Sequence, residues 1–249
     1  MDLTGKVALV TGGSGDLGAA IAQALAKEGV SVAVSYVGER ERAEQTAAAV
    51  QALGCQAFTV QLDQTNATMA EEAVAATVQH FGHLDILVNN AGWNIGIPFP
   101  DLDALTPEVW DRMYATNVRG PYLLARAVAR PMRAQKRGRI VNIASVAGLQ
   151  PGGSSLAYAT SKAALIHLTR CLAVALAPDV LVNCVAPGLI EGTRMAQRIP
   201  PAMLETIRKL ALLGRSATTE DLAAQVVAFC RSESVTGQVL PIDGGLFPR

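Results

Sequence analysis

The sequence predicts an α/β protein with a doubly wound, Rossmann-like parallel sheet and helices on both of its faces. Two observations lead to this prediction. Short runs of apolar and β-branched residues alternate along the 249-residue chain with longer Ala- and Leu-rich stretches. The short runs are apolar throughout, which is typical of strands that are buried on both faces of a parallel sheet. Strands that alternate with helices then imply right-handed crossover connections.

Each element is predicted from the same pattern. Strands are expected at Val7–Thr11, Val30–Tyr36, Ala57–Gln61, Ile86–Asn89, Arg139–Ile143, Leu181–Val185 and Gln238–Ile242. Helices are expected at Gly18–Glu28, Arg40–Leu53, Met69–Phe81, Pro107–Gln135, Leu156–Ala177, Met203–Leu213 and Thr219–Cys230. No repeat or linker interrupts the order, so residues 1–249 are expected to form one domain. The least regular stretch, about 188–216, is interpreted as a substrate loop, because long loops in compact α/β folds are often functional.

Composition excludes several classes of partner. The 21 basic and 21 acidic residues balance, which argues against nucleic acid or an anionic membrane as a general partner. Four widely spaced cysteines and three histidines form no zinc-binding pattern, so no metal site is expected. Neither a signal peptide nor an uncharged apolar run of ~18 residues is evident. We therefore expect a soluble, cytoplasmic protein with reduced thiols.

A glycine-rich turn follows the first predicted strand. Gly13, Gly15 and Gly18 have the spacing of a dinucleotide-binding fingerprint and lie where that strand meets a helix. Glycines let backbone amides approach a pyrophosphate, which binds at the positive end of the helix. The position of this turn predicts a dinucleotide site, whereas the spacing alone would be weak evidence.

A second motif lies in the middle of the chain. Tyr158 and Lys162 form Tyr-x-x-x-Lys, thirteen residues after Ser145, which ends a predicted strand. Residues four apart share a helix face, so the Lys162 ammonium can lie near the Tyr158 hydroxyl. A free phenol has a pKa of ~10, and the positive charges of Lys162 and of an oxidised nicotinamide are expected to lower the pKa of Tyr158.

These motifs resemble those of the short-chain dehydrogenase/reductase family, and of its 3-oxoacyl-carrier-protein reductases in particular. Thr11, Gly12 and Gly18 match the family pattern Thr-Gly-x-x-x-Gly-x-Gly. The resemblance implies an NAD(P)(H)-dependent oxidoreductase that interconverts a ketone and a secondary alcohol. It also implies four catalytic residues: Tyr158 as acid/base, Ser145 as the group that orients the carbonyl, Lys162 as the ligand of the nicotinamide ribose, and Asn117 as the holder of a water for proton relay.

Further matches extend the resemblance over essentially the whole chain. Asn89-Asn90-Ala91-Gly92 follows the fourth strand, Asp63 follows the third, and Asp243-Gly-Gly245 lies near the end. The implied cofactor contacts are Gly12, Ser14, Gly15, Asp16, Leu17, Gly18, Tyr36, Asp63, Asn89, Asn90, Ala91, Gly92, Tyr158, Lys162, Pro187, Gly188, Ile190 and Thr193. Thr193 stands one place later than the family's threonine, after Gly192.

Asp16 departs from the family pattern, because it holds the place of the middle glycine. An aspartate in the first turn of a helix suits the helix dipole. A carboxylate close to a bound pyrophosphate would instead repel it. The sequence leaves two alternatives open: Asp16 points into solvent, or it weakens cofactor binding.

The second strand bears on the choice between NAD and NADP. An acidic residue at its end would select NAD, and a basic one the 2′-phosphate of NADP. Tyr36 occupies that place, and Ser14, Ser35, Arg40 and Arg42 are candidate phosphate ligands. The two positions that are usually basic in NADP-specific relatives hold Gly15 and Val37. We expect NADP(H) over NAD(H). In the alternative interpretation, Arg40 and Arg42 bind no phosphate and only form the solvated start of a helix.

Substrate and assembly are less constrained. The residues expected to face a carbonyl or alcohol substrate of moderate polarity are Trp93, Asn94, Ile95, Leu149, Gln150 and the loop from Leu189 to Met203. Lys136 and Arg137 could dock an acidic carrier protein. Asp179, however, stands where the 3-oxoacyl-carrier-protein reductases usually carry another arginine. The apolar helix around Ala163–Ala177 suggests a subunit interface, and the resemblance implies a homotetramer.

Two other functions compete with the redox enzyme. A non-catalytic dinucleotide-binding regulator would not need Asn117, Ser145, Tyr158 and Lys162, although Asp16 fits it. A sugar epimerase would need a larger C-terminal domain than this chain provides.

Overall fold

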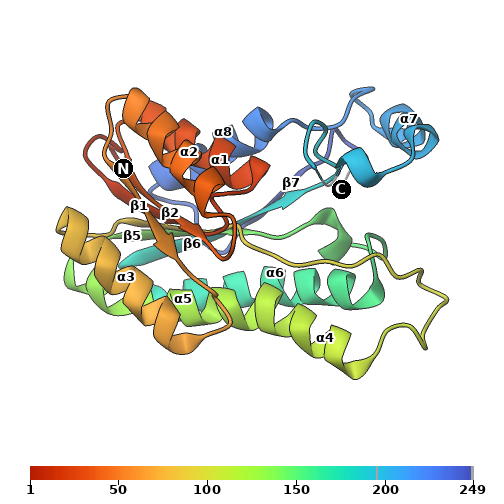
Figure 1. Cartoon of the computed structure of the whole chain (residues 1–249), viewed down its shortest axis with the longest axis horizontal. Coiled ribbons are helices and arrows are strands. Elements are labelled where there is room, and N and C mark those ends of the chain that lie inside the picture. The colour runs from red at the N-terminus through yellow and green to blue at the C-terminus, as the bar shows by residue number, and fades with distance from the viewer. Residues whose placement is uncertain (195, 248–249) are drawn as a thin grey trace.

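Seven parallel strands form one sheet in the computed structural model, which describes residues 1–194 and 196–247 (Figure 1). The strand order is β3-β2-β1-β4-β5-β6-β7. Their bounds are β1 (Val7–Val10), β2 (Ser31–Tyr36), β3 (Ala57–Gln61), β4 (Ile86–Asn89), β5 (Gly138–Ile143), β6 (Val180–Pro187) and β7 (Val239–Ile242). The predicted doubly wound, Rossmann-like fold is confirmed.

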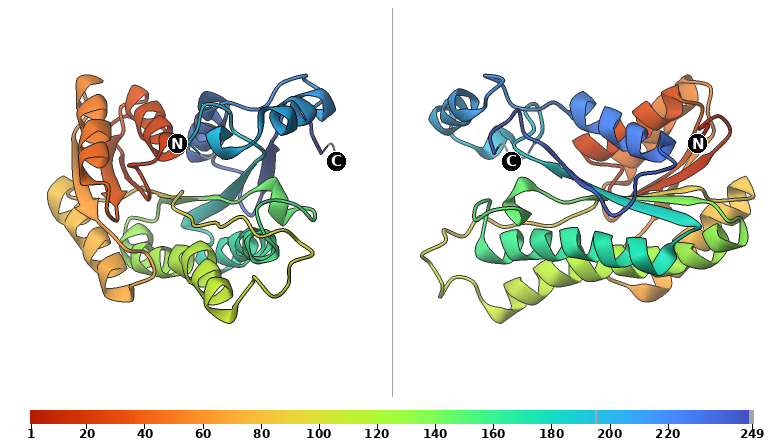
Figure 2. Two further views of the ribbon diagram at one scale, coloured as in Figure 1. Left: turned by 45° about the vertical axis from the view of Figure 1, so that its right-hand side comes forward. Right: turned by 180° about the vertical axis from the view of Figure 1, so that it is seen from behind.

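Helices cover both faces of the sheet. The helices α1 (Asp16–Lys27), α2 (Arg40–Ala52) and α8 (Thr219–Arg231) lie on one face. On the other lie α3 (Ala67–Phe81), α5 (Gly120–Ala134) and α6 (Leu156–Leu176), with α4 (Pro107–Tyr114) against α6 (Figures 1 and 2). Each face has its own apolar core, because strand residues point alternately to the two sides. The helix α7 (Pro201–Leu210) projects beyond the sheet.

Most predicted bounds agree with the structure to within two residues, and local capping explains several differences. The Asn66 side chain accepts hydrogen bonds from the amides of Thr68 and Met69, so α3 begins two residues before the predicted start. A capping box between Thr218 and Asp221 fixes the start of α8.

The predicted helix Pro107–Gln135 is one continuous helical stretch in the structure, from Pro107 to Ala134, with a change of helix type inside it. A π-helical segment at Ala115–Arg119 separates α4 from α5. The Gln64 side-chain amide donates to the carbonyl of Thr116 at 2.8 Å, and this bond draws a backbone acceptor out of the helical ladder. π-Helical turns of this kind are often found at functional sites.

The helix α6 is long and apolar enough, by length and composition, to pass a test for a membrane span. Half of its apolar window is buried inside the protein, and the core helix of a soluble protein passes the same test. This helix is therefore weak evidence for a membrane protein.

Candidate active site

The carboxyl ends of β1 and β4 lie side by side at the centre of the sheet. The chain leaves β1 toward β2 and later returns to β4 on the other side, which makes this point a topological switch. Thr11 joins the two loops there, because its hydroxyl accepts hydrogen bonds from the amides of Asn90 (3.0 Å) and Ala91 (2.9 Å). The Asn90 side chain donates to the carbonyl of Thr11 at 2.9 Å. The segment that follows β4 thus supports the glycine-rich turn.

The glycine-rich turn is shaped to receive a pyrophosphate. A Cβ on Gly18 would lie 2.3 Å from the carbonyl oxygen of Gly12, and one on Gly13 would lie 2.5 Å from a methyl group of Val34. Both positions therefore require glycine. No side chain among the described residues caps the start of α1 at Gly15, so the first-turn amides are open to an anionic ligand. These residues fit the phosphates of a dinucleotide.

The first of the two alternatives left open by the sequence, an Asp16 that points into solvent, is wrong. Its carboxylate accepts hydrogen bonds from the Arg42 guanidinium and from the backbone amide of Arg194, both at 2.8 Å. Burial acts to raise the pKa of Asp16, but these two hydrogen bonds outweigh it and hold that pKa below its usual value. The negative charge of Asp16 is therefore compensated within the protein and does not point freely into solvent.

Ser145, Tyr158 and Lys162 meet near the carboxyl end of β5. Ser145 follows this strand, and its side chain hydrogen-bonds with the phenol of Tyr158. The Ser145 hydroxyl also lies 3.4 Å from the carbonyl of Pro187 and accepts from the amide of Ala147 at 3.2 Å. Ser155 caps α6 by accepting from the Tyr158 amide, so the phenol stands in the first turn of this helix. The structure thus brings together a hydroxyl and a phenol from two distant segments.

Lys162 lies one helical turn after Tyr158 and is buried. Its ammonium donates to the carbonyl of Ile143 at 2.9 Å and lies 5.7 Å from the centre of the Tyr158 ring. Burial lowers the pKa of Lys162 to about 8. Gly92 borders the same space, because a Cβ there would lie 3.5 Å from the ammonium and 3.3 Å from an oxygen of Asn117.

Lys162 by itself does not produce the expected lowering of the Tyr158 pKa. Burial raises the pKa of Tyr158, and the hydrogen bond with Ser145 lowers it only in part. The reason is desolvation, because a phenolate in largely protein surroundings loses its hydration. The charge of Lys162 is directed to Ile143 and does not offset that loss.

Asn117 is held in the π-helical segment and is 1 % exposed. Its side chain accepts from the amide of Trp93 at 2.8 Å and donates to the Trp93 carbonyl at 2.9 Å and to the hydroxyl of Ser161 at 3.1 Å. Asn117 therefore ties the loop after β4 to α6 beside Lys162.

The remaining predicted cofactor residues have varied surroundings. Asp63 accepts from the amide and hydroxyl of Thr65. Asn89 is buried in the sheet, where its amide donates to Asn142 at 2.8 Å. Thr193 donates to the carbonyl of Ile190 at 2.8 Å. Tyr36 and Pro187 end their strands, Ser14 and Gly188 lie on the loops that follow β1 and β6, and Leu17 lies in the first turn of α1.

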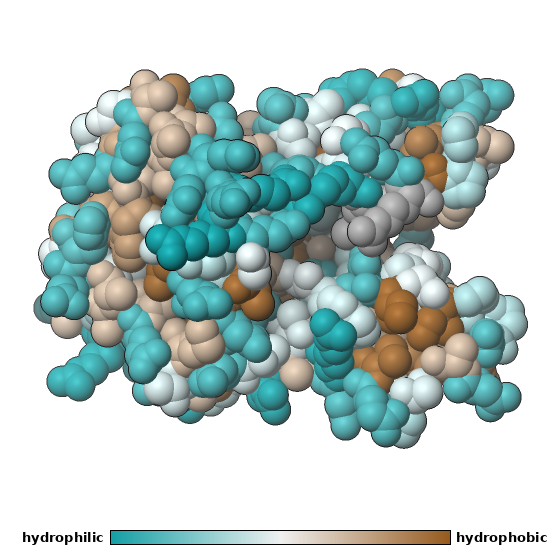
Figure 3. Space-filling view, in the orientation of Figure 1, coloured by the Kyte–Doolittle hydropathy of each residue, from teal (hydrophilic) through white to brown (hydrophobic). Residues whose placement is uncertain are grey.

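A deep notch opens beside the site between α7 and the loop that joins β4 to α4 (Figure 3). Both of these segments carry exposed apolar side chains: Ile95 and Leu102 on the loop, and Met203, Leu210, Leu212 and Leu213 on or after α7. Arg112 stacks on the Trp93 ring at 4.2 Å, at the base of that loop. Met195, which the predicted substrate loop includes, lies outside the described residues.

The predicted carrier-docking pair is wrongly placed for this notch. Lys136 and Arg137 lie between α5 and β5, at the amino ends of the strands, and Arg137 binds Asp85 at 2.9 Å. The site lies at the opposite, carboxyl edge of the sheet. The sequence already indicates this, because the pair immediately precedes a strand of a predicted parallel sheet, whereas Ser145 follows the same strand.

Two residues that support the site were missed by the sequence interpretation. Gln64 donates to the carbonyls of Thr116 and Ala91, and so connects the π-helical segment with the loop after β4. Ser161 is the hydroxyl partner of Asn117. The sequence feature that reflects the position of Gln64 is Gly120, because a Cβ at residue 120 would lie 2.6 Å from the Gln64 side chain.

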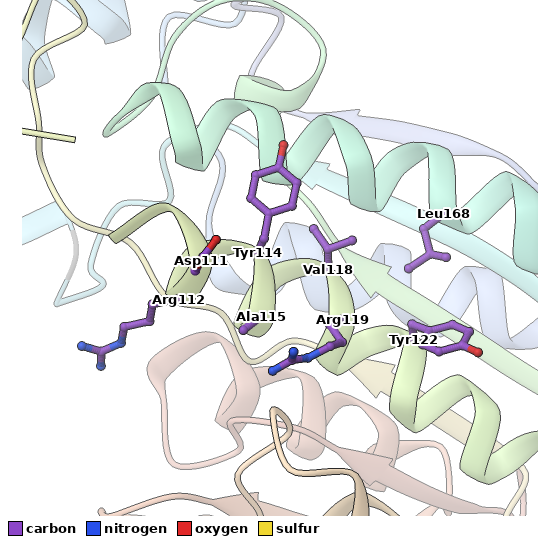
Figure 4. Close-up of a pocket in the computed structure, with 8 residues that line it drawn as sticks. All are labelled: Asp111, Arg112, Tyr114, Ala115, Val118, Arg119, Tyr122 and Leu168. Carbon is purple, nitrogen blue, oxygen red and sulfur yellow. The ribbon is translucent and has the colours of Figure 1, made fainter. Parts of the chain in front are cut away.

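A separate pocket of about 770 Å³ lies on the outer face of α4, the π-helical segment and α5 (Figure 4). Tyr114, Val118, Tyr122 and Leu168 line it together with Asp111, Arg112, Ala115 and Arg119. None of the residues expected to react lies in this pocket. Within residues 1–194 and 196–247, no three His, Cys, Asp or Glu side chains form a group that could hold a metal ion.

Comparison with known proteins places this geometry in context. The family model described as short chain dehydrogenase matches residues 6–203. A Streptomyces violaceoruber protein named ketoacyl reductase 2 of the granaticin polyketide synthase is 41 % identical over 241 residues, which cover 96 % of this chain and 95 % of that protein.

Two solved structures share the fold. NAD⁺-bound xylitol dehydrogenase superimposes with a TM-score of 0.92 at 32 % identity, over 98 % of this chain and 100 % of that one. The NADPH-dependent 3-quinuclidinone reductase from Rhodotorula rubra superimposes with a TM-score of 0.90 at 29 % identity, over 100 % and 93 %. These comparisons confirm the predicted resemblance, and the two structures differ in their nucleotide.

Proposed function

Since the chain belongs to the short-chain dehydrogenase family and is an NAD(P)-dependent oxidoreductase, we propose that it interconverts a ketone and a secondary alcohol with Tyr158 as the acid/base. The observation that carries this proposal is the hydrogen-bonded pair of Ser145 and Tyr158 beside the buried ammonium of Lys162. An oxidoreductase of this family needs a proton donor at that point, whereas a non-catalytic regulator does not.

Each group has a distinct task in reduction. When bound, the nicotinamide cofactor supplies a hydride for the carbonyl carbon. Tyr158 donates its phenolic proton to the carbonyl oxygen, and Ser145 donates a hydrogen bond to the same oxygen. The Lys162 ammonium, which uses one N–H for Ile143, has two more to stabilise the phenolate and to bind the nicotinamide ribose. Asn117 holds the segments around Lys162 in place, and its oxygen faces Gly92 at the same space. Oxidation of the alcohol runs the same transfers in reverse.

Several groups would hold the cofactor. The amides of the glycine-rich turn and the start of α1 would bind its pyrophosphate. Thr193, Ile190 and the Pro187–Gly188 segment would border the nicotinamide end. The adenosine end would lie over Asp63 and the segment Asn89–Gly92.

We favour NADP(H) over NAD(H). Tyr36, which is uncharged, ends β2 where an acidic residue would select NAD. The Arg42 guanidinium donates to the carbonyl of Ser14 at 2.9 Å, so a cation already lies against the turn. Arg40, by contrast, pairs with Glu44 on the exposed side of α2. Arg42 is therefore the better candidate for binding the 2′-phosphate.

Fluorescence titration tests the cofactor assignment. The protein is expected to bind NADPH at least about tenfold more tightly than NADH, since a charge-assisted phosphate contact contributes ~1.5–3 kcal/mol. The variant Arg42→Ala should lose most of that difference and leave NADH binding within about threefold, whereas Arg40→Ala serves as the matched control. Equal binding of both nucleotides by the native protein would contradict the NADP assignment.

A carbonyl panel tests the reaction itself. With the preferred nucleotide, NADPH oxidation is followed at 340 nm against cyclic, aryl and β-keto ester ketones, with Tyr158→Phe as the control. Turnover of at least one ketone that disappears in this variant supports the proposal. Nucleotide binding without turnover of any ketone or secondary alcohol would contradict it.

A ketoacyl thioester is a second candidate substrate, favoured by the relative named as a ketoacyl reductase. The position of Arg137 on the other edge of the sheet removes one argument for a carrier protein. Comparison of acetoacetyl-carrier protein with acetoacetyl-N-acetylcysteamine separates the two. A kcat/KM preference of less than about threefold for the carrier form would exclude docking as a source of specificity.

We also propose a homotetramer. The exposed side of α6 carries Val174, which is 82 % exposed, and next to it Tyr122 and Leu168 line the outer pocket. The other apolar residues of this helix, Leu165, Ile166, Leu172 and Leu176, pack inside the chain. Sedimentation should give four chains, and Val174→Glu with Tyr122→Glu should give smaller species. A monomeric native protein would contradict the proposal.

A further inference from the structure

Four charged side chains join three segments of the chain beside the glycine-rich turn. Asp16 begins α1, Glu39 and Arg42 stand at the start of α2, and Arg194 belongs to the loop after β6. Arg42 contacts Asp16 at 2.8 Å, and Arg194 contacts Glu39 at 2.9 Å and Asp16 at 3.7 Å. The four charges sum to zero, and all four side chains are between 29 % and 49 % exposed.

The bond with the most defined geometry in this cluster involves the backbone. The amide of Arg194 donates to the Asp16 carboxylate at 2.8 Å, across 178 residues of sequence. A backbone amide has no conformational freedom of its own, so this bond fixes the position of the loop itself. Exposed ion pairs alone contribute little, whereas a charge-assisted hydrogen bond within a network is stronger.

Arg194, where the loop is attached, lies next to residues that are expected to contact the bound cofactor. Thr193 precedes Arg194, and its hydroxyl both donates to Ile190 and accepts from the amide of Ala196. Thr193 therefore links Ile190 with Ala196, and the chain is attached at Arg194 to the phosphate end of the site. α7, which flanks the notch, follows shortly after (Figure 2).

We propose that Asp16 is a positioning residue that fastens the substrate loop to the cofactor turn. A glycine at this place, as in the family pattern, would have no oxygen to accept the Arg194 amide. The substitution thus gives this chain a loop that is held before cofactor or substrate binds, and Glu39 and Arg42 hold the two partners in position. This role rests on the proposed function, because it requires that the loop borders the substrate.

Hydrogen exchange of the protein without nucleotide tests the attachment directly. Asp16→Gly should accelerate exchange of the Arg194 amide, followed in peptides covering residues 190–200, by about tenfold or more. Asp16→Asn, which keeps an acceptor oxygen without the charge, should restore part of the protection. Glu39→Gln, which weakens the side-chain pairs of Glu39 but leaves the bond between the Arg194 amide and Asp16 in place, should have a smaller effect than Asp16→Gly.

A matched control is available on α2, where Glu44 pairs with Arg40 at 2.7 Å away from the loop. Glu44→Gln should leave exchange at residues 190–200 within about twofold of the native protein, as expected for an exposed pair. Unchanged exchange in Asp16→Gly would overturn the inference, and so would an equal acceleration in Glu44→Gln.

Kinetics with saturating NADPH and the best ketone of the panel supply the functional test. Asp16→Gly should raise the KM for the ketone about tenfold and change kcat by less than about threefold, because the reacting groups are untouched. An unchanged KM would overturn the positioning role. The two proposals fail differently: exchange is measured without nucleotide, whereas absence of nucleotide binding to both native protein and Asp16→Gly would refute only the proposed function.

Discussion

Two charged side chains are buried at opposite edges of the sheet, and their surroundings differ. Asp85, just before β4, is fully buried and accepts hydrogen bonds from the amide of Val7 (3.0 Å) and the guanidinium of Arg137 (2.9 Å), with His83 at 3.1 Å. Lys162 is 5 % exposed and donates to one carbonyl, that of Ile143. No ion pair joins it to a carboxylate of residues 1–194 and 196–247.

The difference separates a structural charge from a reactive one. A buried charge is costly unless it is paired and hydrogen-bonded, and Asp85 satisfies this condition. Lys162 retains free N–H groups and a pKa lowered by burial to about 8, which is the pattern expected of a functional group.

Tyr158→Phe is expected to reduce kcat for ketone reduction by about 10³-fold or more, because no other proton donor is positioned for the carbonyl oxygen. The measurement is NADPH oxidation at 340 nm with the best ketone of the panel. Nucleotide affinity should change by less than about threefold, and the thermal midpoint should hold. A residual rate within tenfold of the native one would show that another group supplies the proton.

Arg137→Ala is expected to lower the free energy of unfolding by about 3 kcal/mol, because it leaves the buried Asp85 carboxylate with weaker partners. Denaturant unfolding measures this, and kcat per folded enzyme should stay unchanged, since the pair lies away from the reacting groups. Arg126→Ala, which removes an exposed pair with Glu71, is the matched control and should cost less than about 1 kcal/mol. Equal losses would remove the distinction.

Lys162→Met is expected to have the converse effect. Turnover should fall by about 10²-fold, because the phenolate of Tyr158 loses its stabilising charge. Stability should remain equal or rise, because an apolar side chain of similar length replaces an unpaired buried charge. Activity and denaturant unfolding are compared with those of Arg137→Ala. A large loss of stability in Lys162→Met would show that Lys162, like Asp85, is a structural charge.

The pH dependence of reduction gives the smallest effect. Burial holds the pKa of Lys162 at about 8 and raises that of Tyr158, so the phenol stays protonated while Lys162 loses its charge. kcat/KM for the ketone should be level below pH ~8 and fall up to about tenfold per unit above it. Stability should rise with pH between ~8 and ~10.5, because the unfolded chain then binds more protons at this lysine. A flat profile to pH 10 would contradict the assignment.

Much of the fold and of the site could be predicted because the relevant signals are local. Continuous apolar runs identify strands buried on both faces, and β3 and β4 match their predicted bounds. The spacing of Ser145, Tyr158 and Lys162 is likewise a property of a strand end and one helix face. The π-helical segment at Ala115–Arg119 has one local signal, Pro121, which lacks the N–H that a regular helix needs, but its other partner, Gln64, lies more than fifty residues earlier.

The order of strands and helices, the glycine-rich turn and the reactive groups could be identified from the sequence alone, because each depends on residues within a few positions of one another. The partners of Asp16 and the direction in which burial shifts the Tyr158 pKa became evident only in the folded protein. Each of these depends on contacts between distant segments or on how much water the fold excludes. The carboxylate of Asp16 is the clearest case, since 178 residues separate it from the Arg194 amide that it binds.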